Sequence, residues 1–169
     1  MRQGRQGPHY RVPLRRRREG RTDYRTRLHL VRSGLPRVVV RKTNASIIIQ
    51  VVEFTERGDR VVASAVGRDL KKLGWTASTG SVPAAYLAGL LAGHRAKGKG
   101  IASGVLDIGR HVPTKGGRVF AVLKGLLDAG VSIPHDPVIL PSEDRIAGAH
   151  LSKDVKAMFE AAKARMVAG

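Results

Sequence analysis

The residues best suited to chemistry are arginines near the start of the chain. Four stand in a row at 15–18, and others follow at 21, 25 and 27. A guanidinium group binds phosphate oxygens through paired hydrogen bonds and stacks on bases, so this cluster indicates nucleic acid. A solvated charge run or a targeting segment would have a similar composition. The formal net charge of +18 favours the polyanionic partner.

Tyr24 stands among these arginines and has two interpretations of equal weight. Its ring can stack on an unpaired base. It can equally well support the start of a helix through apolar contacts. The sequence leaves both open.

Residues 94–100, HRAKGKG, form a second basic patch. With Gly93 they nearly reproduce the phosphate-binding loop of nucleotide hydrolases, which ends in Lys followed by Ser or Thr. Gly100 stands where that hydroxyl must hold magnesium, and the segment follows a predicted helix where the motif needs a strand. We therefore predict no nucleotide hydrolysis and interpret the segment as a flexible basic loop that RNA phosphates can approach.

A third candidate is PTKGGR at residues 113–118, at the predicted start of a helix. The free N–H groups of a helix N-terminus attract anions, and the glycines permit close approach. The alternative is an ordinary glycine-rich helix cap. We favour a phosphate contact.

The acids and histidines show no catalytic or metal-binding pattern. A two-metal nuclease needs several converging carboxylates, and Asp107 in its predicted strand has only Glu53 as another strand acid nearby. Asp107 is therefore interpreted as structural. The chain has no cysteine, and its six histidines lack metal-ligand spacing. We expect no catalytic residue, metal, cofactor or small-molecule substrate.

The elements that position these residues begin with three β-branched runs. Short polar turns join residues 38–41, 47–54 and 60–65, which predicts an antiparallel meander. Ile47, Ile48 and Ile49 are apolar on both faces, so their strand is expected to be central and covered on both sides.

Helices and one further strand follow the meander. A strand is predicted at 105–108, and Ser152 is expected to cap the final helix. The fold class is therefore α/β, with a mixed sheet that begins with the antiparallel three-strand meander and has helices packed on it. The other predicted helices span residues 68–73, 84–96 and 118–129.

The basic charge is concentrated in an N-terminal arm. Residues 1–42 hold 14 of the 31 Lys and Arg but two of the 13 acids. Residues 1–20 have few apolar side chains, so alone they are expected to be disordered. A short helix should begin with Thr22 as N-cap and end at Gly34. We divide the chain into an arginine-rich arm with a short helix at 1–34, an α/β domain at 35–151 and a C-terminal helix at 152–169.

The apolar stretches are short. The longest, from Val82 to Gly93, falls below the roughly 20 residues that span a bilayer. No signal-peptide core follows the basic start. We expect a cytoplasmic protein with no membrane partner.

Several blocks of the sequence resemble, in the same order, the universal 5S-rRNA-binding family of the large ribosomal subunit, number eighteen of that series, in its archaeal form. The likeness covers about residues 10–151. The blocks are RRRREGRTDYRTR, RVVVRKTNASIIIQVVEF, GDRVVASAVG, PAAYLAGLLAG, LDIGRHVPTKGGRVFAVLKGLLDAG and IPHDPVILPSEDRIAGAH.

The resemblance implies a translational-machinery α/β fold, related to the ribonuclease-H-like sheet without its catalysis. It implies contacts to 5S rRNA and 23S rRNA in the central protuberance, beside another 5S-binding protein. It also implies RNA contacts at the arm, at the hairpin 41–44 and at 114–118. With the basic patches, the expected RNA-binding residues are Arg11, Arg15, Arg16, Arg17, Arg18, Arg21, Tyr24, Arg25, Arg27, Arg32, Arg41, Lys42, Thr43, Asn44, Arg95, Lys97, Lys99, Thr114, Lys115 and Arg118.

The predicted function is a structural, non-catalytic component of the large ribosomal subunit that binds 5S rRNA and helps attach it to 23S rRNA. Two other classes of protein are alternatives to it. The first is a nuclease built on the same sheet, but this chain lacks the carboxylate cluster that such an enzyme needs. The second is a nonspecific DNA binder, which an experiment with RNA and DNA competing for the protein would distinguish from the predicted function.

Overall fold

The computed structural model describes residues 7–168 and contains one four-stranded sheet in the order β3-β2-β1-β4. Its strands are β1 (Arg37–Lys42), β2 (Ile47–Thr55), β3 (Gly58–Val66) and β4 (Val105–Asp107). The first three pair antiparallel, and β4 pairs parallel to β1. The predicted mixed sheet with its antiparallel meander is confirmed.

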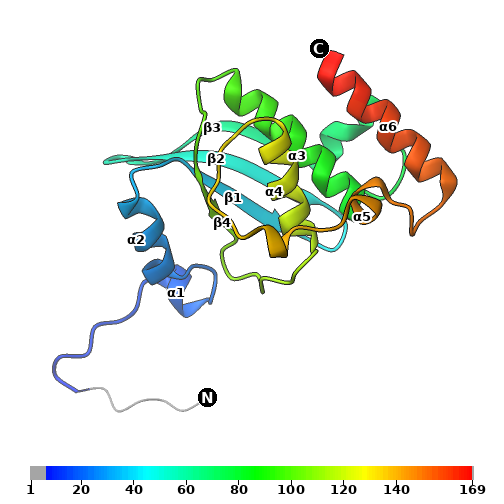
Figure 1. The fold of residues 1–169 in the computed structure, drawn as a ribbon. Coiled ribbons are helices and arrows are strands. Elements are labelled where there is room, and N and C mark those ends of the chain that lie inside the picture. Colours follow the sequence, from blue (N-terminus) through cyan, green and yellow to red (C-terminus); the bar gives the residue numbers. More distant parts are fainter. Residues whose placement is uncertain (1–6, 169) are drawn as a thin grey trace.

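One layer of helices covers one face of this sheet (Figure 1). The main members are α3 (Val82–Lys97) and α4 (Arg118–Asp128), joined at the far end by α6 (Lys153–Ala168). Shorter pieces complete the layer: the 3-10 helices η1 (Gly67–Leu73) and η2 (Pro137–Ile139), and the helix α5 (Glu143–Ala147).

The start of α3 follows the sequence rules for a helix N-terminus. The Ser81 side chain accepts a hydrogen bond from the Ala84 N–H, and Pro83 stands in the first turn. Twelve of the sixteen residues of α3 are buried, so this helix is the centre of the core.

Two glycines let α3 and α4 pack closely. A Cβ at Gly125 would collide with the backbone carbonyl of Tyr86, and one at Gly89 with the carbonyl of Val122. The small residues on these two helices therefore set the distance between them.

The opposite face of the sheet is only partly covered. Ile47 and Ile49 point into the core and are buried, whereas Ile48 between them is 37% exposed. The prediction that this strand is covered on both sides is wrong, although β2 does lie inside the sheet. Alternation puts Ile48 on the open face, which no second helix layer covers within residues 7–168.

The N-terminal arm lies against that open face. It contains α1 (Arg15–Arg18) and α2 (Tyr24–Arg32). The N-cap of α2 is Asp23, whose carboxylate accepts from the N–H groups of Arg25 and Thr26. Thr22, the predicted cap, instead accepts a hydrogen bond from Arg16 Nε.

Residues 15–18 form the helical turn α1 in the whole protein, and the expectation that residues 1–20 are disordered on their own stays a prediction. Residues 1–6 of that prediction lie outside the described residues. No helix within 7–168 is both long and apolar enough to cross a membrane.

Candidate nucleic-acid interface

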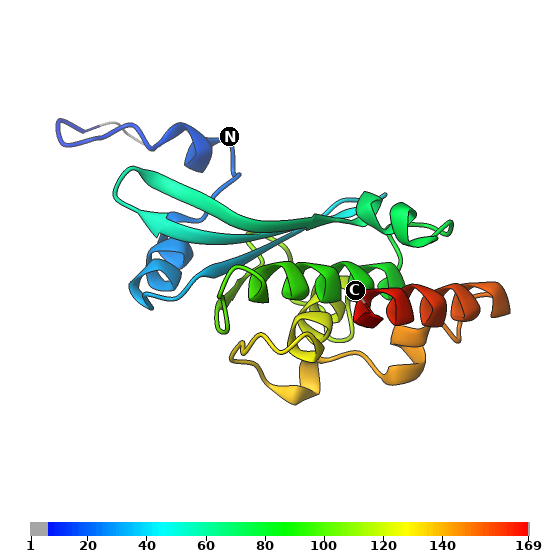
Figure 2. The ribbon, with the colours of Figure 1, turned by 90° about the horizontal axis from the view of Figure 1, so that it is seen from above.

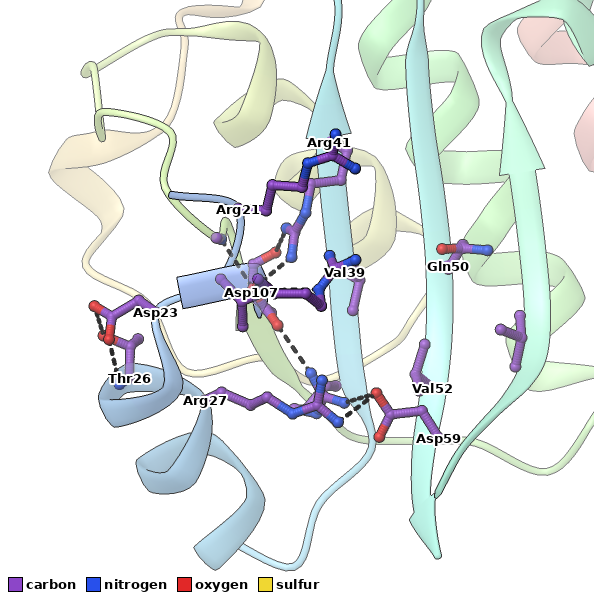
Figure 3. A pocket seen from close by; sticks show the side chains of 15 residues that line it. Arg21, Asp23, Thr26, Arg27, Val39, Arg41, Gln50, Val52, Asp59 and Asp107 are labelled. Atoms are coloured by element: carbon purple, nitrogen blue, oxygen red, sulfur yellow. Dashed lines mark hydrogen bonds and ion pairs between the residues drawn. The ribbon is translucent and has the colours of Figure 1, made fainter. Parts of the chain in front are cut away.

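A network of ion pairs, buried at its centre, fixes the arm to the sheet (Figure 3). Asp59 Oδ2 accepts from Arg27 Nη2 of α2 at 2.8 Å and from Arg37 Nη2 of β1 at 2.7 Å. Arg37 Nη1 then donates to Asp107 Oδ2 at 3.0 Å, and Arg41 Nη2 donates to Asp107 Oδ1 at 3.1 Å. The chain of charges thus runs from the arm through β3 and β1 to β4.

Asp107 is a structural residue at the centre of this network. Its side chain is almost wholly buried, and Oδ1 also accepts from the Gly109 N–H at 2.8 Å. Both oxygens are therefore occupied by donors of the protein itself. The interpretation of Asp107 as a satisfied structural aspartate agrees with this geometry.

Asp59 is the acid that sequence reasoning missed. The sequence pattern places it in a turn, but it belongs to β3 and faces Phe54 of β2. Within residues 7–168, no group of three His, Cys, Asp or Glu could hold a metal ion. Arg37 on β1 is buried and needs an acid within reach, but only the structure shows this burial, so no local sequence pattern marked Asp59.

The tip of the β1–β2 hairpin is held by its own side chains and by the helix layer. Thr43 Oγ1 and the Ser46 backbone hydrogen-bond in both directions at 3.0 Å, and Thr79 Oγ1 donates to the Ala45 carbonyl at 2.6 Å. The Asn44 side chain takes part in none of the hydrogen bonds among the described residues and is exposed. It is free to meet a ligand.

Arg118 connects this hairpin to the start of α4. Its Nη1 donates to the carbonyls of Thr43 at 2.9 Å and Gly80 at 3.1 Å. Next to the hairpin turn, the Lys42 N–H donates to His111 Nε2 at 3.2 Å. Two predicted segments, 41–44 and 114–118, are thereby brought together.

Between them lies a groove of about 380 Å³, and the described residues that line it include no acid. Arg145 and His150 enter it from α5 and the loop that follows, and neither was predicted. No local pattern marks them, because their role depends on α5 folding back beside the hairpin. The lining comprises Lys42, Gly80, Ser81, Val82, Thr114, Gly117, Arg118, Arg145, His150 and Leu151.

The cations of this groove change the protonation of a neighbouring histidine. Partial burial lowers the pKa of His111, and the positive charges of Lys42, Arg41 and Arg118 lower it further. Neutral imidazole is the form that can accept the Lys42 N–H.

The arm carries its arginines in two states. Arg15 and Arg21 pair with Glu19, and Arg27 pairs with Asp59. Another group is exposed and makes no ion pair within the described chain: Arg11, Arg17, Arg18, Arg25 and Arg32.

A second hollow, of about 150 Å³, joins the arm to the loop after β4. Arg17 and Arg25 line it together with Tyr24 and with Arg110, which was not predicted. Tyr24 is half-buried at the first position of α2. Three arginines and one aromatic ring thus line this hollow together with the carboxylate of Asp23, the N-cap of α2.

The patch with Arg95, Lys97 and Lys99 does not join these sites. It lies at the C-terminal end of α3, about 24 Å along the helix from Ser81 and the groove. Arg95 also pairs with Asp69 and donates to the Ser64 carbonyl. As expected, the near P-loop follows a helix, and its Gly98 is the C-cap of α3.

Fold and surface together define a class: a mixed α/β domain with a cationic arm and groove suited to a polyanion. A family model described as ribosomal large subunit proteins 60S L5 and 50S L18 matches residues 8–102 and 96–136. The chain therefore belongs to this family of ribosomal proteins.

Relatives named large ribosomal subunit protein uL18 agree. That of Korarchaeum cryptofilum is 52% identical over 89% of this chain and 77% of its own length. That of Aeropyrum pernix is 52% identical over 91% of this chain and 72% of its own length. That of Methanothrix thermoacetophila is 48% identical over 95% of this chain and 98% of its own length. The chain is a structural component of the large subunit in the cytoplasmic ribosome, and the prediction that it is not an enzyme is confirmed by this membership.

Proposed function

We propose that this protein binds 5S rRNA and helps to attach it to 23S rRNA in the central protuberance, beside another 5S-binding protein. Family membership supplies the ribosomal setting. The likeness of the arm and hairpin blocks to the 5S-rRNA-binding family points to the particular RNA.

The observation that carries the proposal is the cationic groove formed by Lys42, Thr114, Arg118, Arg145 and His150. Three segments far apart in the sequence bring cations to one concave surface, while the rigid hairpin presents the polar tip of Asn44 beside it. Cations bind phosphate regardless of sequence, and a polar tip can read a base edge or a 2′-hydroxyl. The arm adds exposed arginines on the other face of the sheet.

Arg41, Arg95 and Arg118 enter this proposal with a reduced role. Each already donates to a carboxylate or carbonyl of the protein. They position the hairpin and the sheet, and their remaining N–H groups are available to phosphate.

A nuclease on this sheet is disfavoured by a specific contact. Asp107, the acid best placed for catalysis, is held by Arg37, Arg41 and the Gly109 N–H. A carboxylate occupied in this way cannot ligate a metal without losing those partners.

The test begins with sequencing the RNA that co-purifies with the tagged protein, in which 5S rRNA should be enriched. The groove is then tested by Lys42→Glu/Arg145→Glu, which reverses the charge of two residues that line it. Its matched control is Lys71→Glu/Lys156→Glu, which changes the net charge equally on η1 and α6, away from the groove.

We expect the groove variant to lower 5S rRNA affinity at least about tenfold more than the control, a difference of about 1.4 kcal/mol. Equal losses would mean that total charge, not the groove, determines binding. Equal affinity of the wild type for DNA of the same length would favour the nonspecific DNA binder.

A further inference from the structure

An apolar groove lies where α2 runs into β1, beside the free end of the β2–β3 hairpin. It has a volume of about 340 Å³ and is lined by Val31, Leu35, Pro36 and Phe54 together with the edge residues Gly34, Glu53 and Thr55. Phe54 is 57% exposed and Leu35 39%. Figure 2 shows this hairpin end extending past α3, with α2 beside it.

The groove is held in shape before any partner arrives. Asp59 stands opposite Phe54 on the paired strand, and its carboxylate binds Arg27 of α2 and Arg37 of β1. These contacts fix α2 against the hairpin end, and Arg37 is almost wholly buried. A preformed apolar groove loses little entropy on binding.

This surface lacks the excess of positive charge that the chain has as a whole. Among the described residues that line it, Glu53 is the one with a charge, and none is Lys or Arg. Glu56 follows in the turn, Arg60 stands across the strand pair from Glu53, and Arg57 completes the turn. The two acids and two arginines balance, so this surface offers an RNA backbone little net electrostatic attraction.

We propose that this groove binds a protein, through an apolar side chain of the partner inserted beside Phe54 and a Lys or Arg of the partner paired with Glu53. Exposed aromatic and aliphatic side chains around a hollow with few charges are typical of the centre of a protein interface. The acid at the rim selects a cationic segment. This surface is separate from the basic groove, so the proposal goes beyond RNA binding.

The test places the photo-crosslinking amino acid p-benzoylphenylalanine at Phe54 in tagged protein that is incorporated into large subunits in cells. The same substitution at Leu35 is a second probe of the groove. Val112, which is 73% exposed in the loop near the basic groove, is the matched control for a site expected to meet RNA. Crosslinked products are treated with nuclease or protease and identified by mass spectrometry.

At Phe54 or Leu35 we expect one nuclease-resistant, protease-sensitive product whose crosslinked peptide contains Lys or Arg. Adding Glu53→Lys should reduce its yield at least about fivefold, and Lys71→Glu should not. The binding of 5S rRNA by the Phe54 variant should equal that of the wild type.

Three results would overturn the proposal. A crosslink to RNA at Phe54 and Leu35 would assign the groove to base stacking. The absence of any product above the unirradiated background at both positions would show that no partner covers this groove. An unchanged yield with Glu53→Lys would remove the role of charge.

Discussion

At the residue scale, arginine serves two purposes in this protein. Arg27, Arg37 and Arg41 pair with Asp59 and Asp107 and hold the architecture together. Exposed arginines of the arm keep their donors for a polyanion. The side chain is the same in both cases, and the difference is whether a carboxylate lies within reach.

The stability of the ion-pair network can be tested at Asp107. Asp107→Asn removes the charge that compensates Arg37 and Arg41, so we expect a decrease of about 3 kcal/mol in the free energy of unfolding. Glu143→Gln, at a side chain that is 83% exposed, should stay within about 0.5 kcal/mol of the wild type. Urea denaturation measures both, and a decrease below about 1 kcal/mol for Asp107→Asn would contradict a compensating role.

The exposed Asn44 at the hairpin tip separates recognition from turn support. Thr43, Ser46 and Thr79 hold the turn, so Asn44→Ala should leave the melting temperature unchanged. We expect it to weaken 5S rRNA binding by about 1–3 kcal/mol, because the RNA group that Asn44 would satisfy has no partner in the variant. Binding to an unrelated RNA of equal length should barely change. Equal effects on the two RNAs, with a lower melting temperature, would assign Asn44 to the turn.

His111 should make the tip of the β1–β2 hairpin sensitive to acid, because it accepts the Lys42 N–H there. Its pKa is lowered in the folded protein, so the unfolded chain takes up this proton at a higher pH. The stabilisation from neutral His111 is therefore present above its ordinary value of about 6.5 and is lost as the pH falls through the folded value.

The variant His111→Gln keeps an acceptor for the Lys42 N–H but does not titrate. Its free energy of unfolding, followed from about pH 7.5 to about pH 5, should fall less than that of the wild type. If the free energies of unfolding of the two proteins fall in parallel with pH, His111 does not contribute to the acid sensitivity. The other histidines are present in both proteins, so their contributions to the pH dependence cancel in the comparison.

At the scale of elements, the contact between α3 and α4 carries the core, and glycine makes it possible. Gly125 faces the Tyr86 carbonyl and Gly89 faces the Val122 carbonyl, so the two backbones approach without side chains between them. Displacing either helix would also move the start of α4, where Arg118 holds the hairpin. The shape of the groove thus depends on helix packing about two turns along α4 from Arg118.

Gly125→Ala should therefore lower the free energy of unfolding by about 1–3 kcal/mol, because the new methyl group overlaps backbone that cannot rotate away. Gly98→Ala is the control, since a Cβ there meets its nearest neighbour, the His94 carbonyl, at an ordinary 3.5 Å. Thermal melting of both proteins decides the point. Equal melting temperatures would mean that α3 and α4 can move apart to accept the methyl group with little loss of stability.

At the scale of the whole molecule, two cationic surfaces lie on a core that does not need them. The arm occupies the open face of the sheet and the basic groove lies at the end of the helix layer. None of residues 7–20 is buried. Residues 7–20 therefore add no side chain to the core.

Deleting residues 1–20 should leave a domain that unfolds cooperatively, since Arg27 still pairs with Asp59. RNA affinity should fall, and so should the slope of log affinity against log salt, by roughly 0.7–0.9 for each phosphate that the shortened protein no longer neutralises. Filter binding at several salt concentrations gives the slope. An unchanged slope would show that these residues do not touch the RNA backbone.

The sequence by itself determined the fold class, the main helices and strands, the cationic arm and the structural role of Asp107. These follow from local rules: β-branched runs with short turns, Pro83 as a favoured first residue of a helix, and charge that exceeds any internal pairing. The resemblance of ordered blocks added the family, which the relatives confirm.

Only the tertiary structure decided which cations lie together. It joined Lys42 and Arg118 with the unpredicted Arg145 and His150, and it separated Lys97 and Lys99 from them by the length of α3. The structure also shows that Asp59, expected in a turn, belongs to the ion-pair network and that Ile48 is exposed. Local patterns could not show this, because ion pairing and coverage of a sheet face depend on segments that meet only after folding.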